Sequence, residues 1–163
     1  VGAATKGFQA PGIRLGWAIA SRRHVELFRN FSSIAMGGVS RLSQLYALRL
    51  LEPDRVRQAR AAVPAFFNRQ RARYAEGFAR LGLALHTGQG GFYHWAKLPG
   101  SLTAAQLNER LFAHGAAILP GHLCDMARRA GQESPLDRFI RFSFGPLPAA
   151  SYERDLEILA ACL

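Results

Sequence analysis

One amphipathic segment dominates the middle of the sequence. From Asp54 to Leu81, apolar residues recur at three- to four-residue steps or their multiples, with arginines between them. The recurring positions are Val56, Ala59, Val63, Phe67, Tyr74, Phe78 and Leu81. This spacing predicts one long helix that ends at Gly82. Because Pro64 has no backbone N–H, it should either kink this helix or mark the point where two helices meet.

The hydrophobic period changes after Gly82, where short apolar runs alternate with helical spacing. Three strands are expected, over residues 92–96, 116–119 and 139–144. Two helices are expected, one capped by Ser101 or Thr103 and running to about His114, and one from Ala149 to Cys162. Strands interleaved with helices predict a small α/β domain with a three- to four-stranded sheet and its own core.

The first fifty residues give a less regular pattern. The apolar run from Ile13 to Ala20 follows Pro11-Gly12 and is typical of a short buried strand. Three further elements are expected: a helix capped by Ser21 and ending at Asn30, a loop over residues 31–41, and a helix from about Ser43 to Leu51. The chain therefore divides into residues 1–41 and a more compact part, residues 42–163.

Composition restricts the possible functions. The 163 residues carry a formal net charge of +10, which would suit a nucleic-acid partner. However, the arginines are scattered over nearly every segment and the two lysines are Lys6 and Lys97, so we expect no nucleic-acid contact from this segment. The sequence has no apolar run of about twenty residues, and we expect a cytoplasmic protein without a membrane partner. Cys124 and Cys162 lie far apart without a histidine cluster, so neither a metal site nor a disulfide is expected.

Residues suited to catalysis lie near the start of the sequence. Lys6 is followed by Pro11-Gly12 and, eight positions after the lysine, by Arg14. The amine of a lysine can attack a carbonyl, and a guanidinium matches the geometry of a phosphate. The same spacing also fits an exposed loop with a solvated lysine and arginine, and taken by itself it favours this second interpretation.

This stretch resembles a family signature. Residues 6–17 are similar to the pattern K-x4-PG-x-R-x-G, followed by Trp or Tyr, of class I and II aminotransferases, the aspartate-aminotransferase-like enzymes of fold type I that use pyridoxal phosphate. The resemblance implies that Lys6 is the catalytic lysine that binds pyridoxal phosphate, and that Arg14 binds the cofactor's phosphate. Many relatives carry a serine for this phosphate where this sequence has Ala3, and Thr5 is expected to take its place.

Three later segments resemble the same family. They are residues 90–95, similar to a GG-x-F-x-W/Y strand, residues 117–121, similar to a V-x-x-x-PG turn, and residues 139–144, similar to the strand whose arginine holds the substrate's α-carboxylate. The resemblance gives this carboxylate contact to Arg141. Taken alone, Arg141 on a strand would simply face solvent, and the aromatic run from Phe92 to Trp95 would be core packing. The order and spacing of all four motifs together favour the family.

The resemblance also implies what the intact protein is. Residues 1–41 would be the remnant of the large domain that binds pyridoxal phosphate, and residues 42–163 the linking helices and the C-terminal small domain. The sequence begins without a methionine and reaches the lysine within six residues, so we expect the C-terminal portion of a longer enzyme, inactive by itself. The expected partners are an amino acid, a 2-oxo acid and a second subunit in a homodimer. Residues 31–38 contain no arginine where members specific for dicarboxylates bring one from the neighbouring subunit.

The implied activity is transfer of an amino group between an amino acid and a 2-oxo acid. Three alternatives remain open. They are another enzyme of the same fold and cofactor (a lyase, decarboxylase or synthase), an aminotransferase-like effector domain of a transcription regulator, and a structural module that binds no cofactor. An arginine that holds the substrate carboxylate favours transamination over decarboxylation.

Overall fold

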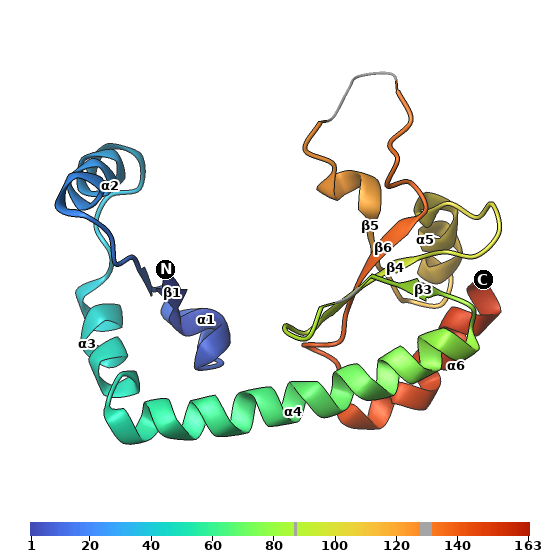
Figure 1. The fold of residues 1–163 in the computed structure, drawn as a ribbon, viewed down its shortest axis with the longest axis horizontal. Helices are drawn as coiled ribbons and strands as arrows, with labels where there is room; N and C mark the ends of the chain where they lie inside the picture. Colours follow the sequence, from blue (N-terminus) through green and yellow to red (C-terminus); the bar gives the residue numbers. More distant parts are fainter. Residues whose placement is uncertain (87, 128–131) are drawn as a thin grey trace. The chain divides into compact units, whose positions relative to one another are not determined.

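The computed structural model describes residues 1–86, 88–127 and 132–163. They form two compact units, Val1–Ala65 and Phe66–Leu163. The division falls within the longest helix, α4 (Pro53–Arg80), which is continuous through Pro64 (Figure 1). The long helix predicted from the sequence is therefore confirmed as one element. The assignment of residues 1–41 to a large domain and of residues 42–163 to a small one concerns the intact protein and stays a prediction.

The second unit is built on a four-stranded antiparallel sheet, which confirms the predicted α/β class. The strand order is β3 (Ala84–Leu85), β4 (Tyr93–Lys97), β6 (Phe139–Ser143) and β5 (Leu119–Pro120). The strand predicted over residues 116–119 is wrong in its bounds. Only Leu119 and Pro120 pair with β6, because the N–H of Ile118 instead donates to the side chain of Asn108 at 3.0 Å.

Successive side chains of the central strands β4 and β6 point to opposite faces of the sheet, one covered and one more exposed. On the covered face, His94 of β4 lies opposite Phe142 of β6. Tyr74 and Phe78 of α4 pack against this face, with their ring centroids 5.0 Å from that of Phe142. The largest fully buried side chains of the unit are Tyr74, Phe78, Phe144, Leu98, Leu107, Ile140, His94 and Cys162. This set forms the hydrophobic core of the second unit.

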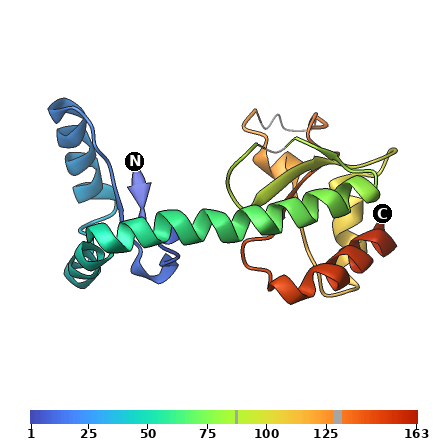
Figure 2. The ribbon, with the colours of Figure 1, turned by 60° about the horizontal axis from the view of Figure 1, so that its bottom comes forward.

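Polar contacts join α4 to the C-terminal helix α6 (Tyr152–Cys162), which lies beside it (Figure 2). The hydroxyl of Tyr74 donates to Asp155 at 2.7 Å, and the hydroxyl of Tyr152 donates to the carbonyl of Arg73 at 2.8 Å. Burial raises the pKa of Tyr74, and its hydrogen bond to Asp155 raises it further. The Tyr74 phenol is therefore a neutral donor that fixes the two helices against each other.

The helix α5 (Ala104–Phe112) completes this unit and begins as the sequence predicted. Thr103 accepts a hydrogen bond from the backbone of Gln106, and the side chain of Gln106 accepts one from the backbone of Thr103. This reciprocal capping box satisfies two backbone donors at the start of the helix and stabilises it.

The first unit is made of short elements that leave most of their apolar side chains exposed. It contains β1 (Gly2–Ala3), α1 (Ala4–Gly7), the 3-10 turn η1 (Pro11–Ile13), β2 (Gly16–Trp17), α2 (Arg22–Ala35), α3 (Arg41–Leu50) and the first part of α4. The strands β1 and β2 pair antiparallel. Of the described apolar residues in this unit, Ala4 and Ala47 are the buried ones.

Three predictions for the first unit differ from the structure. The buried strand expected from Ile13 to Ala20 shrinks to Gly16–Trp17, and Ile19 is 91% exposed. The helix expected to end at Asn30 runs on to Ala35, because the serines at 32 and 33 are accommodated in its exposed turns and Gly37, with φ of +68°, lies just beyond its end. The helix predicted from Ser43 starts earlier, at Arg41, where Ser40 caps it.

The buried histidine of the core makes stability depend on pH. His94 is 1% exposed, and its Nε2 lies 3.0 Å from the carbonyl oxygen of Arg71. Burial lowers the pKa of His94 from its ordinary value of 6.5. Once the pH falls below 6.5, the unfolded chain binds a proton at this residue that the folded protein does not. The stabilisation of the folded protein by the buried, neutral His94 is therefore fully present above that pH and is lost as the pH falls.

We expect the free energy of unfolding to decrease below about pH 6.5 by up to ~1.4 kcal/mol per pH unit from His94 alone. His94→Gln should remove this part of the slope, whereas His114→Gln, at an exposed position, should keep it. Urea unfolding at half-unit intervals from pH 7.5 to 4.5 measures both. An unchanged slope in His94→Gln would contradict the assignment.

Candidate functional site

Lys6 lies on a single helical turn that begins where β1 ends. The backbone N–H of Ala4 donates to the carbonyl of Leu15 at 3.0 Å, which extends the β1–β2 pairing by one residue. Thr5 is half-buried, and Lys6 is exposed. Lys6 lines a shallow hollow together with Val1, Gly2, Ala3, Gly7, Phe8 and Trp17. The turn thus presents Lys6 at the surface of the first unit.

Arg14 precedes β2 at the end of the β1–β2 pair, here called the ribbon, at which β1 leads into the turn of Lys6. The register pairs Gly2 with Trp17 and Ala3 with Gly16, so the positions that continue the two strands after Ala4 and Leu15 are Thr5 and Arg14. Arg14 has a left-handed backbone with φ of +51°, which is uncommon for a residue with a side chain. Its side chain is exposed, and Nη1 donates to the carbonyl of Pro11 at 3.3 Å. The backbones at Thr5 and Arg14 therefore lie at the same end of the ribbon.

Gly16 of the signature has a packing reason. A Cβ atom at Gly16 would lie 3.0 Å from the carbonyl oxygen of Gly2 on the paired strand. Glycine lets the two backbones approach closely at this point. The β1–β2 pairing, which precedes the turn of Lys6 and follows Arg14 in the chain, depends on this close approach.

The group at this end of the ribbon is cationic. The three carboxylates of the first unit, Glu26, Glu52 and Asp54, each pair with an arginine three or four residues away on their own helix or beside it. A lysine amine can attack an aldehyde, and a hydroxyl and a guanidinium can donate hydrogen bonds to a phosphate group. Thr5, Lys6 and Arg14 thus fit pyridoxal phosphate by their chemistry.

Arg141 lies in the second unit, on the more exposed face of its sheet. It sits on β6 between Trp95 of β4 and Leu119 of β5. Its side chain is exposed, and its guanidinium lies 4.7 Å from the ring centroid of Tyr93. No acceptor within the described residues bonds this guanidinium. Its N–H groups are therefore available to a carboxylate from outside the unit.

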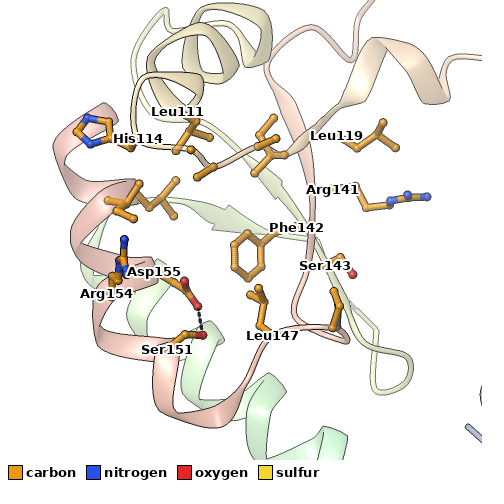
Figure 3. A pocket seen from close by; sticks show the side chains of 17 residues that line it. Leu111, His114, Leu119, Arg141, Phe142, Ser143, Leu147, Ser151, Arg154 and Asp155 are labelled. Atoms are coloured by element: carbon orange, nitrogen blue, oxygen red, sulfur yellow. Dashed lines mark hydrogen bonds between the residues drawn. The ribbon is translucent and has the colours of Figure 1, made fainter.

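A cavity of about 530 Å³ opens on the other side of β6. Its walls are mostly apolar and come from the end of α5, the segment before β5, β6 and α6; they include Leu111, Leu119, Phe142, Leu147, Ile158 and Leu159. Arg141 contributes to the rim, but its guanidinium points away from the interior (Figure 3). Asp155, the acidic group of the cavity, accepts hydrogen bonds from Tyr74 and Ser151. The cavity therefore does not include the cationic end of Arg141.

The Pro-Gly turn after β5 fixes where β6 begins. Gly121 is buried, and a Cβ atom there would lie 2.5 Å from the carbonyl oxygen of Leu136 and 2.6 Å from that of Phe139. Only glycine fits without a backbone shift. The turn predicted from the sequence thus packs closely against Phe139, which lies two residues before Arg141 on β6.

The loop before β4 is held by an arginine that the sequence analysis did not single out. Arg71 of α4 donates to the carbonyl of Gln89 at 2.8 Å and to that of Gly91 at 2.6 Å. Gly91 has φ of +79°, which explains one glycine of the Gly-Gly pair. Arg71 lies about twenty residues from its acceptors, so no local pattern could have indicated the contact.

Lys6 and Arg14 belong to the first unit and Arg141 to the second, and the geometry of each group is defined within its own unit. The model for class I and II aminotransferases matches residues 1–157. The chain belongs to this family.

Solved aminotransferases share the fold of this family member. An aminotransferase from Mycobacterium tuberculosis is 25% identical, with a TM-score of 0.78 over 97% of this chain and 39% of the other. A Thermus thermophilus aspartate aminotransferase mutant is 24% identical, with a TM-score of 0.77 over 99% and 42% of the two chains. A Pyrococcus horikoshii kynurenine aminotransferase is 18% identical, with a TM-score of 0.80 over 94% and 37%. No curated protein matches the chain.

This aminotransferase-family chain spans about two fifths of the length of those solved relatives. No helix in the described ranges is long and apolar enough to cross a membrane. Among the same residues, no three His, Cys, Asp or Glu side chains gather as a metal site would require. The roles of Lys6, Thr5, Arg14 and Arg141 stay predictions, now with a defined local geometry.

Proposed function

We propose that the intact protein is an aminotransferase that uses pyridoxal phosphate to move an amino group between an amino acid and a 2-oxo acid. The observation that supports this proposal is the β1–β2 pairing, which extends to Ala4 and Leu15, the residues next to Thr5 and Arg14, in a chain of this family. The solved structures of a Thermus thermophilus and a Pyrococcus horikoshii relative, described as complexed with a pyridoxyl-leucine and with PMP, support the choice of cofactor.

In the proposed site, Arg14 and Thr5 hold the cofactor's phosphate through the guanidinium and the hydroxyl. Pyridoxal phosphate, when bound, supplies the sink for the electron pair left on the substrate's α-carbon. The Lys6 amine holds the cofactor until the substrate arrives. Its Nζ then takes the proton from the α-carbon of the amino donor, and it returns a proton to the α-carbon of the acceptor in the reverse half-reaction.

Arg141 binds the α-carboxylate of both substrates through its N–H groups. Holding the carboxylate keeps that group on the substrate, which favours amino transfer over decarboxylation. Because residues 31–38 provide no arginine, we propose substrates with one carboxylate rather than two.

We further propose that the intact protein is a cytoplasmic homodimer. Apolar side chains of α2 support a second subunit, since Phe28, Phe31 and Ile34 are 51%, 69% and 91% exposed. Light scattering of the intact protein measures the oligomeric state, and a monomer would contradict this part of the proposal.

The activity is tested with the intact protein, pyridoxal phosphate, pyruvate as acceptor and a panel of 15N-labelled amino acids. Mass spectrometry should show 15N-alanine and the donor's 2-oxo acid in equal amounts. Release of CO2 from the donor without alanine would instead indicate a decarboxylase. No turnover of any donor, with the cofactor bound, would contradict enzymatic transamination.

A further inference from the structure

The guanidinium of Arg141 is held by a contact that leaves its hydrogen-bonding edge available. The cation lies over the face of the Tyr93 ring, 4.7 Å from the centroid. A stacked guanidinium uses its planar face, while its N–H groups point outward in the plane. The contact therefore restrains Arg141 without competing for the carboxylate that the proposed function gives it.

Such a restraint matters because an exposed arginine is otherwise free to move. The side chain of Arg141 loses rotational freedom when it binds a ligand, and this loss opposes binding. The described residues offer its guanidinium no carboxylate or carbonyl partner, so the ring of Tyr93 is the contact that can order it beforehand. If the Arg141 side chain is already ordered in the free protein, it loses less rotational freedom when the ligand binds.

The Tyr93 ring is itself positioned from α4. Its centroid lies 4.6 Å from that of Phe92, whose ring lies 5.3 Å from that of Phe67. Phe67 is buried, and Arg71 one turn later holds the carbonyls just before Phe92. The Tyr93 ring is thus connected to α4 through packing and hydrogen bonds.

We infer that Tyr93 is a positioning residue for Arg141, and that its aromatic face rather than its hydroxyl pre-orders the arginine for the carboxylate of the substrates. The inference rests on the proposed function. It goes beyond the family signature, because the register places Arg141 opposite Trp95 and so puts Tyr93 on the neighbouring position of the same sheet face.

The test compares Tyr93→Leu, which removes the ring, with Tyr93→Phe, which keeps it. Pyruvate is titrated into the intact protein and its methyl resonance is followed by NMR, so that no turnover is needed. We expect Tyr93→Leu to weaken pyruvate binding about 3- to 30-fold, the range of an exposed to a desolvated cation–π contact. Tyr93→Phe should stay within about twofold of the unaltered protein. In turnover assays, Tyr93→Leu should raise KM with little change in kcat.

Phe139→Leu is the matched control, because it removes a ring from the same sheet face that lies 5.8 Å from the Lys97 ammonium instead. It should leave the dissociation constant for pyruvate unchanged. Equal weakening in Phe139→Leu, or in Tyr93→Phe, would overturn the inference, as would unaltered binding in Tyr93→Leu. Arg141→Gln separates the two levels of the argument: unaltered pyruvate binding in this variant contradicts the proposed role of Arg141 itself. Thermal melting of each variant confirms that it is folded before titration.

Discussion

Replacement of Lys6 by alanine is expected to lower the rate of amino transfer by at least about a thousandfold, because it removes both the group that binds the cofactor and the base that moves the α-proton. Borohydride reduction in the presence of pyridoxal phosphate should attach the cofactor to the peptide that contains Lys6, and mass spectrometry of the digest should find no such peptide in Lys6→Ala. Alanine also removes the lysine side chain from a hollow that Trp17 lines as well, so pyridoxal phosphate should bind more weakly.

The sequence supplies its own control, since Lys97 is its other lysine. Lys97 lies on β4 of the second unit, with its ammonium over the ring of Phe139. Lys97→Ala removes the same functional group from a different unit, and we expect the rate and the labelling of Lys6 to persist. If Lys97→Ala lost activity and Lys6→Ala kept it, the assignment of the catalytic amine to Lys6 would be contradicted.

The second unit could largely be predicted from the sequence because its apolar patterns coincide with real burial. Phe78 and Tyr74 follow the helical period and are both fully buried, and Thr103 caps the helix that its spacing indicated. The strand that carries Arg141 was placed within one residue of its end. In the second unit the local sequence pattern and the tertiary packing agree, and this agreement allows the structure to be predicted from the sequence.

The first unit was predicted less well for the opposite reason. The apolar residues from Ile13 to Ala20 suggested burial, but the described residues provide little to cover them, and the strand is two residues long. Gly37-Gly38 and several serines together predict a loop over residues 31–41, but α2 continues to Ala35 and ends at its C-cap residue, Met36, directly before Gly37. An apolar run indicates that burial of its side chains is favourable, but it does not identify the element that packs against them.

The candidate site shows the same division between local and distant information. The family resemblance indicates Lys6 and Arg14, whereas their spacing alone favours an exposed loop; the β1–β2 pairing brings the backbones next to them to one end of the ribbon. The contact between Tyr93 and Arg141 joins residues far apart in the sequence, and it exists only because β4 and β6 pair in one particular register. Such contacts require the strand pairing and could not be predicted from periodicity.

The largest expected loss of stability comes from Phe78→Ala. Phe78 is fully buried, and its ring centroid lies 5.0 Å from that of Phe142 and 5.5 Å from that of His94. Because these neighbours belong to two different strands and are held by sheet pairing, they cannot close together over the space the ring leaves, so we expect the free energy of unfolding to fall by about 3–5 kcal/mol. Phe112→Ala is the control, since Phe112 is 62% exposed and its removal should change that free energy by less than about 0.5 kcal/mol. Urea unfolding followed by circular dichroism measures both, and similar losses in the two variants would mean that Phe78 is not part of the core that holds β4 and β6 against α4.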